Sequence, residues 1–236
     1  MFQLHYYPGN ASMIAHIVLE EIGLPINAPF ELVLVDRSQN LHKSAAYLKL
    51  NPNGKIPTLV ERAPGLPDLV LYETAAICLH LADCHPAARL MPPLASHERA
   101  HAYKWLLWLA NTFQPDIMMY FYPERYVAAT DLAVVKQVAD QAQARIGGHL
   151  EQLDDELARV KSRSQGTEDL DDTTWFLGPD YSVLDPYVFT LCRWTRNFSS
   201  QPARAYPHLG PYLRRMAERP AVQRVFATEL LQPPLY

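Results

Sequence analysis

Two short polar segments in the first third of the chain have residue types suited to holding a small anion. Tyr6, Asn10 and Ser12 are side-chain donors around the turn that precedes a predicted helix, and Glu73 and Thr74 stand at the start of another. A helix N-terminus offers free N–H groups and a partial positive charge, so a carboxylate or a thiolate is stabilised there. The alternative is structural: Ser12 is equally well explained as an N-cap, and Glu-Thr before an apolar run as a plain helix start.

A third segment combines a turn with a strand that has proline at its start. Residues 51–59 read Asn-Pro-Asn-Gly-Lys-Ile-Pro-Thr-Leu. The Pro57 ring cannot donate to a β-ladder, so it belongs at the beginning or edge of a strand. A cis bond between Ile56 and Pro57, a state tolerated only before proline, would turn the Ile56 N–H and C=O outward, free to pair with an extended peptide. A plain trans-proline turn is the alternative.

Strand and helix patterns alternate through residues 1–84 and predict an α/β domain. Gly23 and Pro25 are expected to end the first helix, and prolines 86, 92 and 93 mark a linker over 85–97. Strands are expected at 2–6, 30–35, 56–60 and 69–72, and helices at 12–22, at 45–50 and from 73 onward.

From residue 97 onward the strand signals disappear, so the second domain, 97–236, is expected to be all-α. Long helices are predicted over 97–122 and 132–160, the second bent at its paired glycines, 147 and 148. Ser182 and Asp185 form a predicted capping box, in which Ser182 bonds the N–H of Asp185 and Asp185 returns the bond. A solvated loop is expected at 161–172, and shorter helices from about 182, 207 and 220.

Composition excludes several classes of function. The 236 residues are 49% apolar, which suffices for two cores. A net charge of −4 without any Lys/Arg-rich block gives no footprint for nucleic acid or an anionic membrane. Neither a secretion signal nor a run of about 18 apolar residues is present, so we expect a cytoplasmic protein. The three cysteines (78, 84 and 192) and nine histidines show no metal-ligand spacing, which predicts buried free thiols and no metal.

Taken together, these patterns resemble the soluble glutathione transferase superfamily over nearly the whole chain. The resemblance rests on segment 51–59, on Glu-Thr at 73–74, on the Ser182–Asp185 box and on residues 206–222. It implies a thioredoxin-like N-terminal domain, an all-helical C-terminal domain, and glutathione as co-substrate. Glutathione would pair with Ile56 and Pro57, place its γ-glutamyl carboxylate on Thr74, and direct its α-ammonium to Glu73.

The turn at 6–13 departs from the family pattern that it most resembles, that of the bacterial beta class. The nucleophilic cysteine of that class aligns on Ala11, where no thiol is available. The resemblance therefore leaves Ser12, Asn10 or Tyr6 as the donor that holds glutathione as thiolate. Lowering a thiol pKa by two units takes about 2.7 kcal/mol, which one or two donors beside a helix N-terminus can supply.

The predicted function is transfer of glutathione to a small hydrophobic electrophile, as in detoxification, by a homodimer. The electrophile is expected in a groove between the domains, walled by Trp108, Phe113, Met119 and Tyr120, side chains that could equally be core. Two alternatives stand beside this function. One is a glutathione-dependent disulfide or peroxide reductase, and the other is a non-catalytic binding protein of the same fold.

Overall fold

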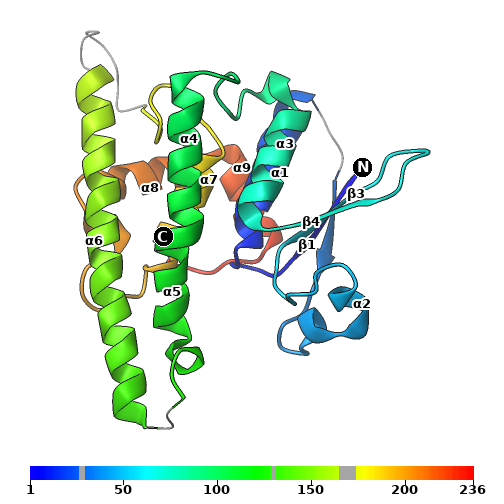
Figure 1. The fold of residues 1–236 in the computed structure, drawn as a ribbon. Coiled ribbons are helices and arrows are strands. Elements are labelled where there is room, and N and C mark those ends of the chain that lie inside the picture. The colour runs from blue at the N-terminus through cyan, green and yellow to red at the C-terminus, as the bar shows by residue number, and fades with distance from the viewer. Residues whose placement is uncertain (27–29, 129–130, 165–173) are drawn as a thin grey trace. The chain divides into compact units, whose positions relative to one another are not determined.

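The computed structural model describes residues 1–26, 30–128, 131–164 and 174–236. Its contacts divide the chain into two compact units, Met1–Met91 with Ala217–Pro233, and Pro92–Met216 with Pro234–Tyr236 (Figure 1). The sequence-based limits, 1–84 and 97–236, assigned the end of the chain to the second domain. Its contacts instead join Ala217–Pro233 to the first unit.

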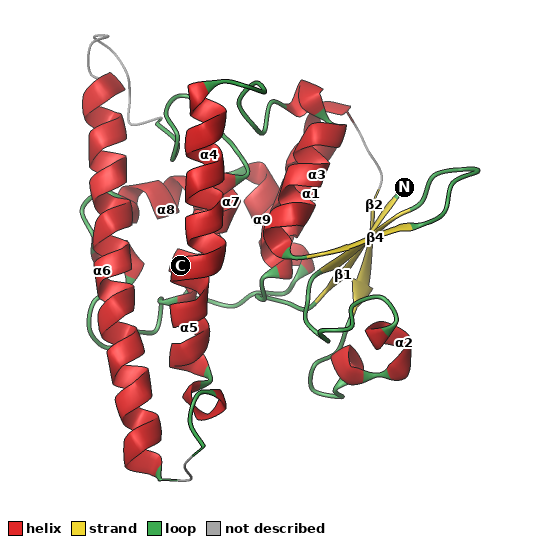
Figure 2. Cartoon of the chain, in the orientation of Figure 1, coloured by secondary structure: helices red, strands yellow, loops and turns green. Residues whose placement is uncertain are grey.

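The first unit is built on a four-stranded mixed sheet with strand order β2-β1-β3-β4 (Figure 2). The strands are β1 (Phe2–Tyr6), β2 (Phe30–Leu34), β3 (Thr58–Glu61) and β4 (Leu69–Tyr72). β1 runs parallel to β2 and antiparallel to β3, and β3 runs antiparallel to β4. The four predicted strands are confirmed. β3 begins directly after Pro57, later than predicted, because proline cannot donate to the ladder.

The α-helices in the described part of this unit are α1 (Ser12–Ile26), α2 (Ala45–Leu48), α3 (Thr74–Cys84) and α9 (Pro220–Thr228). The predicted end of α1 is wrong, because the helix continues through Gly23 and Pro25 to Ile26. A glycine inside a helix costs only about 1 kcal/mol relative to alanine. The core-facing side of α1, where Val18 and Ile22 are 1% exposed, offsets that cost.

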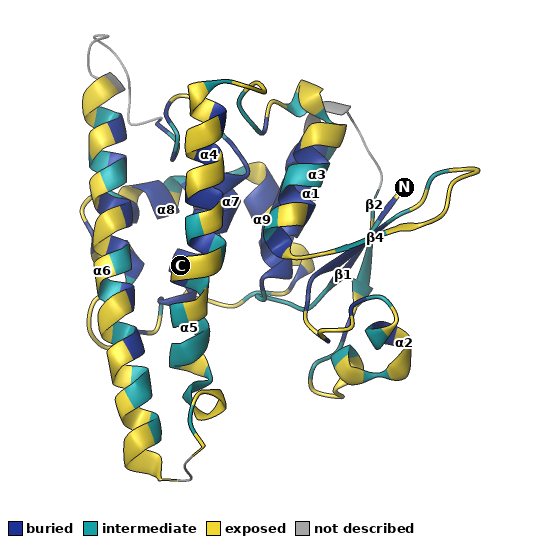
Figure 3. Ribbon diagram, viewed as in Figure 1, coloured by how far each residue is buried: buried dark blue, intermediate teal, exposed yellow. Residues whose placement is uncertain are grey.

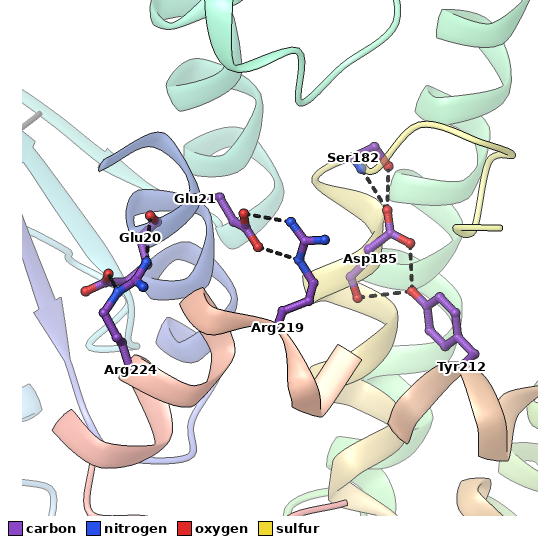
Figure 4. A network of polar contacts seen from close by, with 7 residues as sticks. All are labelled: Glu20, Glu21, Ser182, Asp185, Tyr212, Arg219 and Arg224. Carbon is purple, nitrogen blue, oxygen red and sulfur yellow. Dashed lines mark hydrogen bonds and ion pairs between the residues drawn. The ribbon is translucent and has the colours of Figure 1, made fainter. Parts of the chain in front are cut away.

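The last helix of the chain contacts α1 through two ion pairs (Figure 4). Arg219 reaches both carboxylate oxygens of Glu21, at 2.7 and 2.8 Å, and Arg224 Nε lies 2.5 Å from Glu20. On the same helix Val222 is fully buried. Apolar burial of this kind is worth about 1.5–3 kcal/mol per large side chain, whereas partly exposed ion pairs contribute less. The ion pairs therefore mainly orient a helix that apolar contacts hold.

The regular elements in the described part of the second unit are helices. They are α4 (His97–Trp108), a π-helical turn (Leu109–Phe113), α5 (Gln114–Phe121), α6 (Leu132–Ser164), α7 (Leu184–Trp194) and α8 (Leu209–Glu218). The helical run predicted over 97–122 is confirmed, with one turn of π geometry in its middle. α6 passes Gly147 and Gly148 without interruption (Figure 1). It also reaches Ser164, so the loop prediction is wrong for 161–164, and its remainder, 165–172, lies outside the described residues.

α7 forms the centre of the second unit, because every one of its residues is buried (Figure 3). Its capping box differs from the prediction in one bond. Asp185 accepts from the Ser182 N–H at 2.7 Å as predicted, and the Ser182 hydroxyl donates to that same carboxylate (Figure 4). The hydroxyl oxygen accepts from the Leu184 N–H instead of the Asp185 N–H. The other Asp185 oxygen accepts from the Phe176 N–H and the Tyr212 hydroxyl, each at 2.9 Å. Burial raises the pKa of Asp185 despite these bonds.

All three cysteines are free thiols, as predicted, but only two are buried. Cys78 and Cys192 lie in the two cores, where burial raises the pKa of each thiol well above its ordinary value. Cys84 is exposed at the end of α3, which corrects the prediction. No helix within the described ranges is both long and apolar enough to span a bilayer.

Candidate active site

The sheet brings the ends of three strands together. β1 ends at Tyr6, β3 begins at Thr58 and β4 ends at Tyr72. The ladder register pairs Thr58 with His5 on one side and with Tyr72 on the other. The residues just beyond these strand ends are therefore neighbours at one end of the sheet, and they are the three predicted segments: the turn after β1, Ile56 and Pro57, and Glu73 with Thr74.

The loop that leads into β3 is fixed around the carbonyl of Lys55. This oxygen accepts hydrogen bonds from the Tyr47 hydroxyl at 2.7 Å and from Asn51 Nδ2 at 2.9 Å. Gly54 has a φ of 58°, and a Cβ added there would lie 2.9 Å from the carbonyl oxygen of His42. Glycine is therefore required at this position. The Ile56–Pro57 peptide bond, which follows shortly after Gly54, is cis, as predicted.

The start of α3 is open to a ligand. Glu73 is exposed and adopts φ 71° and ψ 110°, a backbone conformation that residues other than glycine rarely take. Such strained residues cluster at ligand sites. Among the described residues no side chain caps this helix start, so the N–H groups of its first turn keep their attraction for an anion. Thr74, the first residue of α3, is 7% exposed.

The Ser12 hydroxyl is used inside the turn that follows β1. Its Oγ donates to the carbonyl of Tyr7 at 3.1 Å and accepts from the N–H of Tyr7 at 3.2 Å, and the residue is fully buried. The predicted N-cap is therefore corrected: α1 already includes Ser12, and the hydroxyl points back along the chain instead of toward the helix. Met13 N–H bonds the carbonyl of Asn10 at 2.9 Å and begins the helical pattern.

Asn10 and Tyr6 are the other two predicted donors, and both are half-buried. Asn10 Oδ1 accepts from the Ala11 N–H, and its amide nitrogen carries two further donors that this bond does not use. The Tyr6 ring lies 6.2 Å from the ring of His16. Burial, together with the negative charge of Glu229, raises the pKa of Tyr6, so its hydroxyl is a weaker acid and a poorer donor to an anion than an ordinary tyrosine.

Sequence reasoning missed a carboxylate from the far end of the chain that holds this turn. Glu229, whose side chain is fully buried, accepts from the N–H of Gly9 at 2.7 Å and contacts His16 Nδ1 at 2.9 Å. Gly9 and His16 lie on either side of Asn10 and Ser12 in the sequence. Gly9 has a φ of 66° in the turn, and His16 lies inside α1. The two contacts span 220 and 213 residues, so no local pattern could have indicated them.

Trp108 and Phe113, predicted to wall the electrophile site, lie together in the helical unit. Their ring centroids are 5.8 Å apart, and both contact His149, at 5.2 and 5.8 Å. Phe113 is fully buried and belongs to the core, whereas Trp108 is half-buried. Asp116, which the sequence did not single out, bonds His149 Nε2 at 2.8 Å and Arg145 Nε at 2.9 Å.

Met119 and Tyr120, the other two predicted wall residues, are half-buried and have different neighbours. The Met119 sulfur accepts from Arg145 Nη2 at 3.0 Å, and the Tyr120 ring lies 4.4 Å from that of Phe198. A hollow of about 370 Å³ in this unit is bordered by α6 and by Phe198 and Tyr206, and the four predicted wall residues do not line it. The structure thus brings Trp108 and Phe113 into contact, whereas Met119 and Tyr120 have other neighbours. Contact of these residues with an electrophile stays a prediction.

Comparison with known proteins finds relatives that are similar in sequence and in fold. A model of the glutathione S-transferase N-terminal domain matches residues 11–84. Glutathione S-transferase GstA of Escherichia coli O157:H7 is 28% identical over 232 residues, which cover 98% of this chain and 100% of that protein. A Sulfitobacter glutathione transferase homologue with bound glutathione has a TM-score of 0.79 at 25% identity, covering 98% of this chain and 99% of its own. A sphingomonad glutathione S-transferase complexed with glutathione has a TM-score of 0.73 at 31% identity, covering 98% and 100%.

A thioredoxin-like unit with the β2-β1-β3-β4 sheet, joined in one chain to an all-helical unit, defines a class of two-domain proteins with the glutathione transferase fold. Identity of 31% over the full length of the sphingomonad enzyme then fixes the family. This chain belongs to the glutathione S-transferase family.

Proposed function

We propose that this protein is a glutathione transferase that holds glutathione as a thiolate and conjugates it to a small hydrophobic electrophile. One observation carries the proposal. The uncapped start of α3, with Glu73 and Thr74, lies at the same end of the sheet as Ile56 and Pro57. Two relatives of this fold contain bound glutathione, and an anion-binding helix start beside a peptide-pairing loop suits that tripeptide.

Each part of glutathione has a partner in this proposal. The Thr74 hydroxyl and backbone N–H take the γ-glutamyl carboxylate, because they stand where the helix dipole favours negative charge. The exposed Glu73 carboxylate takes the α-ammonium. The main-chain N–H and C=O of Ile56 pair with the extended peptide. These contacts leave the glutathione thiol toward the turn after β1.

In this proposal, residues of the turn after β1 activate the glutathione thiol. We assign the leading role to Asn10, because the Ser12 hydroxyl hydrogen is already donated to Tyr7 and Tyr6 has a raised pKa. Residues 8–13 contain no cysteine, and the resemblance to the beta class would place the nucleophile of that class at Ala11. The thiol proton leaves to water, and the sulfur electron pair forms the new bond to carbon. In substitution the leaving group departs with its bonding pair, and in addition the adduct takes up a proton. This chemistry calls on no metal.

The first prediction tests the binding residues. Thr74→Ala and Glu73→Ala should each weaken glutathione binding, measured by calorimetry, by about 10- to 150-fold, because a lost charge-assisted bond costs about 1.5–3 kcal/mol. Ser96→Ala is the matched control, since Ser96 caps its own helix by accepting from the Arg99 N–H at 3.0 Å. Unchanged affinity in both site variants would refute the assignment.

We further propose the setting in which the enzyme works. Its three free cysteines suit the reducing cytoplasm, where glutathione keeps thiols reduced. A homodimer is proposed from the family resemblance. Exposed apolar side chains on β4 and on α4 support it. The electrophile is proposed to contact the half-buried Trp108, Met119 and Tyr120.

A further inference from the structure

A group of three metal-ligand side chains lies in the first unit and takes no part in the proposed chemistry. Glu61 is the last residue of β3, and His80 and Cys84 lie one helical turn apart on α3. One ligand atom from each residue lies within 4.8 Å of the other two. From this cluster we infer a binding site for Zn²⁺ or a closely similar divalent transition metal.

The spacing of the ligand atoms suits a tetrahedral ion. Cys84 Sγ lies 3.6 Å from His80 Nε2. Zn–S and Zn–N bonds of about 2.3 and 2.05 Å at a tetrahedral angle place sulfur and nitrogen about 3.6 Å apart. Glu61 Oε2 lies closer to His80 Nε2, at 2.6 Å, in a hydrogen bond. The ion replaces the proton of that bond, which requires the pair to open by about 0.7 Å.

The donor set and the local charge favour zinc over other common ions. A thiolate, an imidazole and a carboxylate are the ligand types of zinc sites, whereas Mg²⁺ and Ca²⁺ take oxygen ligands. The Glu61 carboxylate within the cluster and the neighbouring Asp83 are negatively charged and attract a cation.

Three protein ligands leave a fourth position open. The side chains of His80 and Glu61 are 25% and 27% exposed, and Cys84 is exposed, so water or an external ligand reaches the ion. Both backbone supports are regular elements, since His80 and Cys84 share one face of α3 and Glu61 ends a strand paired on both sides. Side chains on such elements need only small rotations to close on an ion.

The site is tested by cobalt titration of the full chain. The protein is tag-free, treated with chelator, kept reduced and free of glutathione, because glutathione itself binds zinc. Co²⁺ should bind at one ion per chain and produce a sulfur-to-cobalt charge-transfer band, and Zn²⁺ should displace it. Cys84→Ser should abolish the band, and His80→Gln and Glu61→Gln should each weaken binding at least about tenfold.

Two controls separate this site from non-specific binding. His101→Gln removes one member of an exposed histidine pair with the same helical spacing, His97 and His101 on α4, and should leave the titration unchanged. Circular dichroism checks that each variant keeps its helices. Absence of the charge-transfer band in the wild-type protein overturns the inference, and so does a band that persists in Cys84→Ser or is lost only in His101→Gln.

Discussion

Asn10 and Ser12 lie two residues apart on one turn, yet their side chains differ in which hydrogen-bonding groups are already used within the protein. Ser12 is fully buried, and its single hydroxyl hydrogen is donated to the Tyr7 carbonyl. Asn10 is half-buried, and among the residues that the structure describes its side chain bonds only through Oδ1, which accepts from the Ala11 N–H. A donor to a thiolate must have a hydrogen to give, so Asn10 is the better candidate.

At the residue scale, we predict that substitution of Asn10 mainly lowers turnover, whereas substitution of Ser12 mainly lowers stability. Asn10→Ala should lower kcat by about ten- to a thousandfold with a smaller effect on glutathione affinity, as loss of one donor to a developing anion does. Ser12→Ala should keep most of its turnover and lose about 1–3 kcal/mol of unfolding free energy, because the half-buried Tyr7 N–H loses its acceptor and the Tyr7 carbonyl loses one of its two donors. Steady-state kinetics and denaturant unfolding measure the two effects.

The reverse pattern, with turnover lost in Ser12→Ala and kept in Asn10→Ala, would show that the Ser12 hydroxyl turns toward the ligand. Wild-type turnover in the double variant between pH 6 and 9 would rule out side-chain activation at this turn. Tyr6 or backbone N–H groups would then be the better account.

At the scale of elements, local sequence patterns predicted correctly those strands whose limits are set by residues a few positions away. The apolar run of β4 predicted that strand with its observed limits, and the proline before β3 predicted that strand to within two residues, because turn and proline chemistry act over a few positions. The end of α1 was missed, since tertiary burial of its apolar face outweighs one glycine. The role of the Ser12 hydroxyl was also missed. An N-cap pattern predicts a bond to the N–H groups of the following helix, whereas the observed partner, the Tyr7 carbonyl, lies before the helix.

The segment after α9 acts on the turn after β1, and this gives an element-scale prediction. Glu229→Ala should lower the unfolding free energy by about 1–3 kcal/mol, because it removes a buried carboxylate that accepts from the Gly9 N–H and contacts the buried His16. Turnover should fall as well, since the Gly9 N–H contact holds the turn that carries Asn10. Denaturant unfolding and steady-state kinetics provide the measurements.

The control for this prediction is Glu218→Ala, which removes an exposed carboxylate of α8. It should change stability by no more than about 0.5 kcal/mol. Glu229→Gln keeps one acceptor and should show an intermediate loss. Equal stability of Glu229→Ala and the wild-type protein would contradict a structural role for these contacts.

For the whole molecule, the sequence indicated two domains but not where the end of the chain belongs. The apolar face of α9 shows that the helix packs on a core, and it does not say which one. The contacts with Glu20 and Glu21 settle this, because they lie about 200 residues away in α1. Long-range pairings of this kind also place Glu229, so the part of the site that depends on the C-terminal segment was beyond sequence reasoning.

The last prediction concerns assembly. The wild-type protein should sediment at micromolar concentration as a dimer, at about twice the chain mass of 26.8 kDa. Leu107 on α4 is 58% exposed, and Tyr103, one turn earlier on the same helix, is 38% exposed. Contiguous exposed apolar side chains commonly mark an interface, so Leu107→Lys should shift the protein toward monomer. Leu132→Lys changes a leucine that is 82% exposed on α6 and should leave the dimer intact. A wild-type protein that remains monomeric at these concentrations would exclude the homodimer, and dissociation by Leu132→Lys alone would move the interface from α4 to α6.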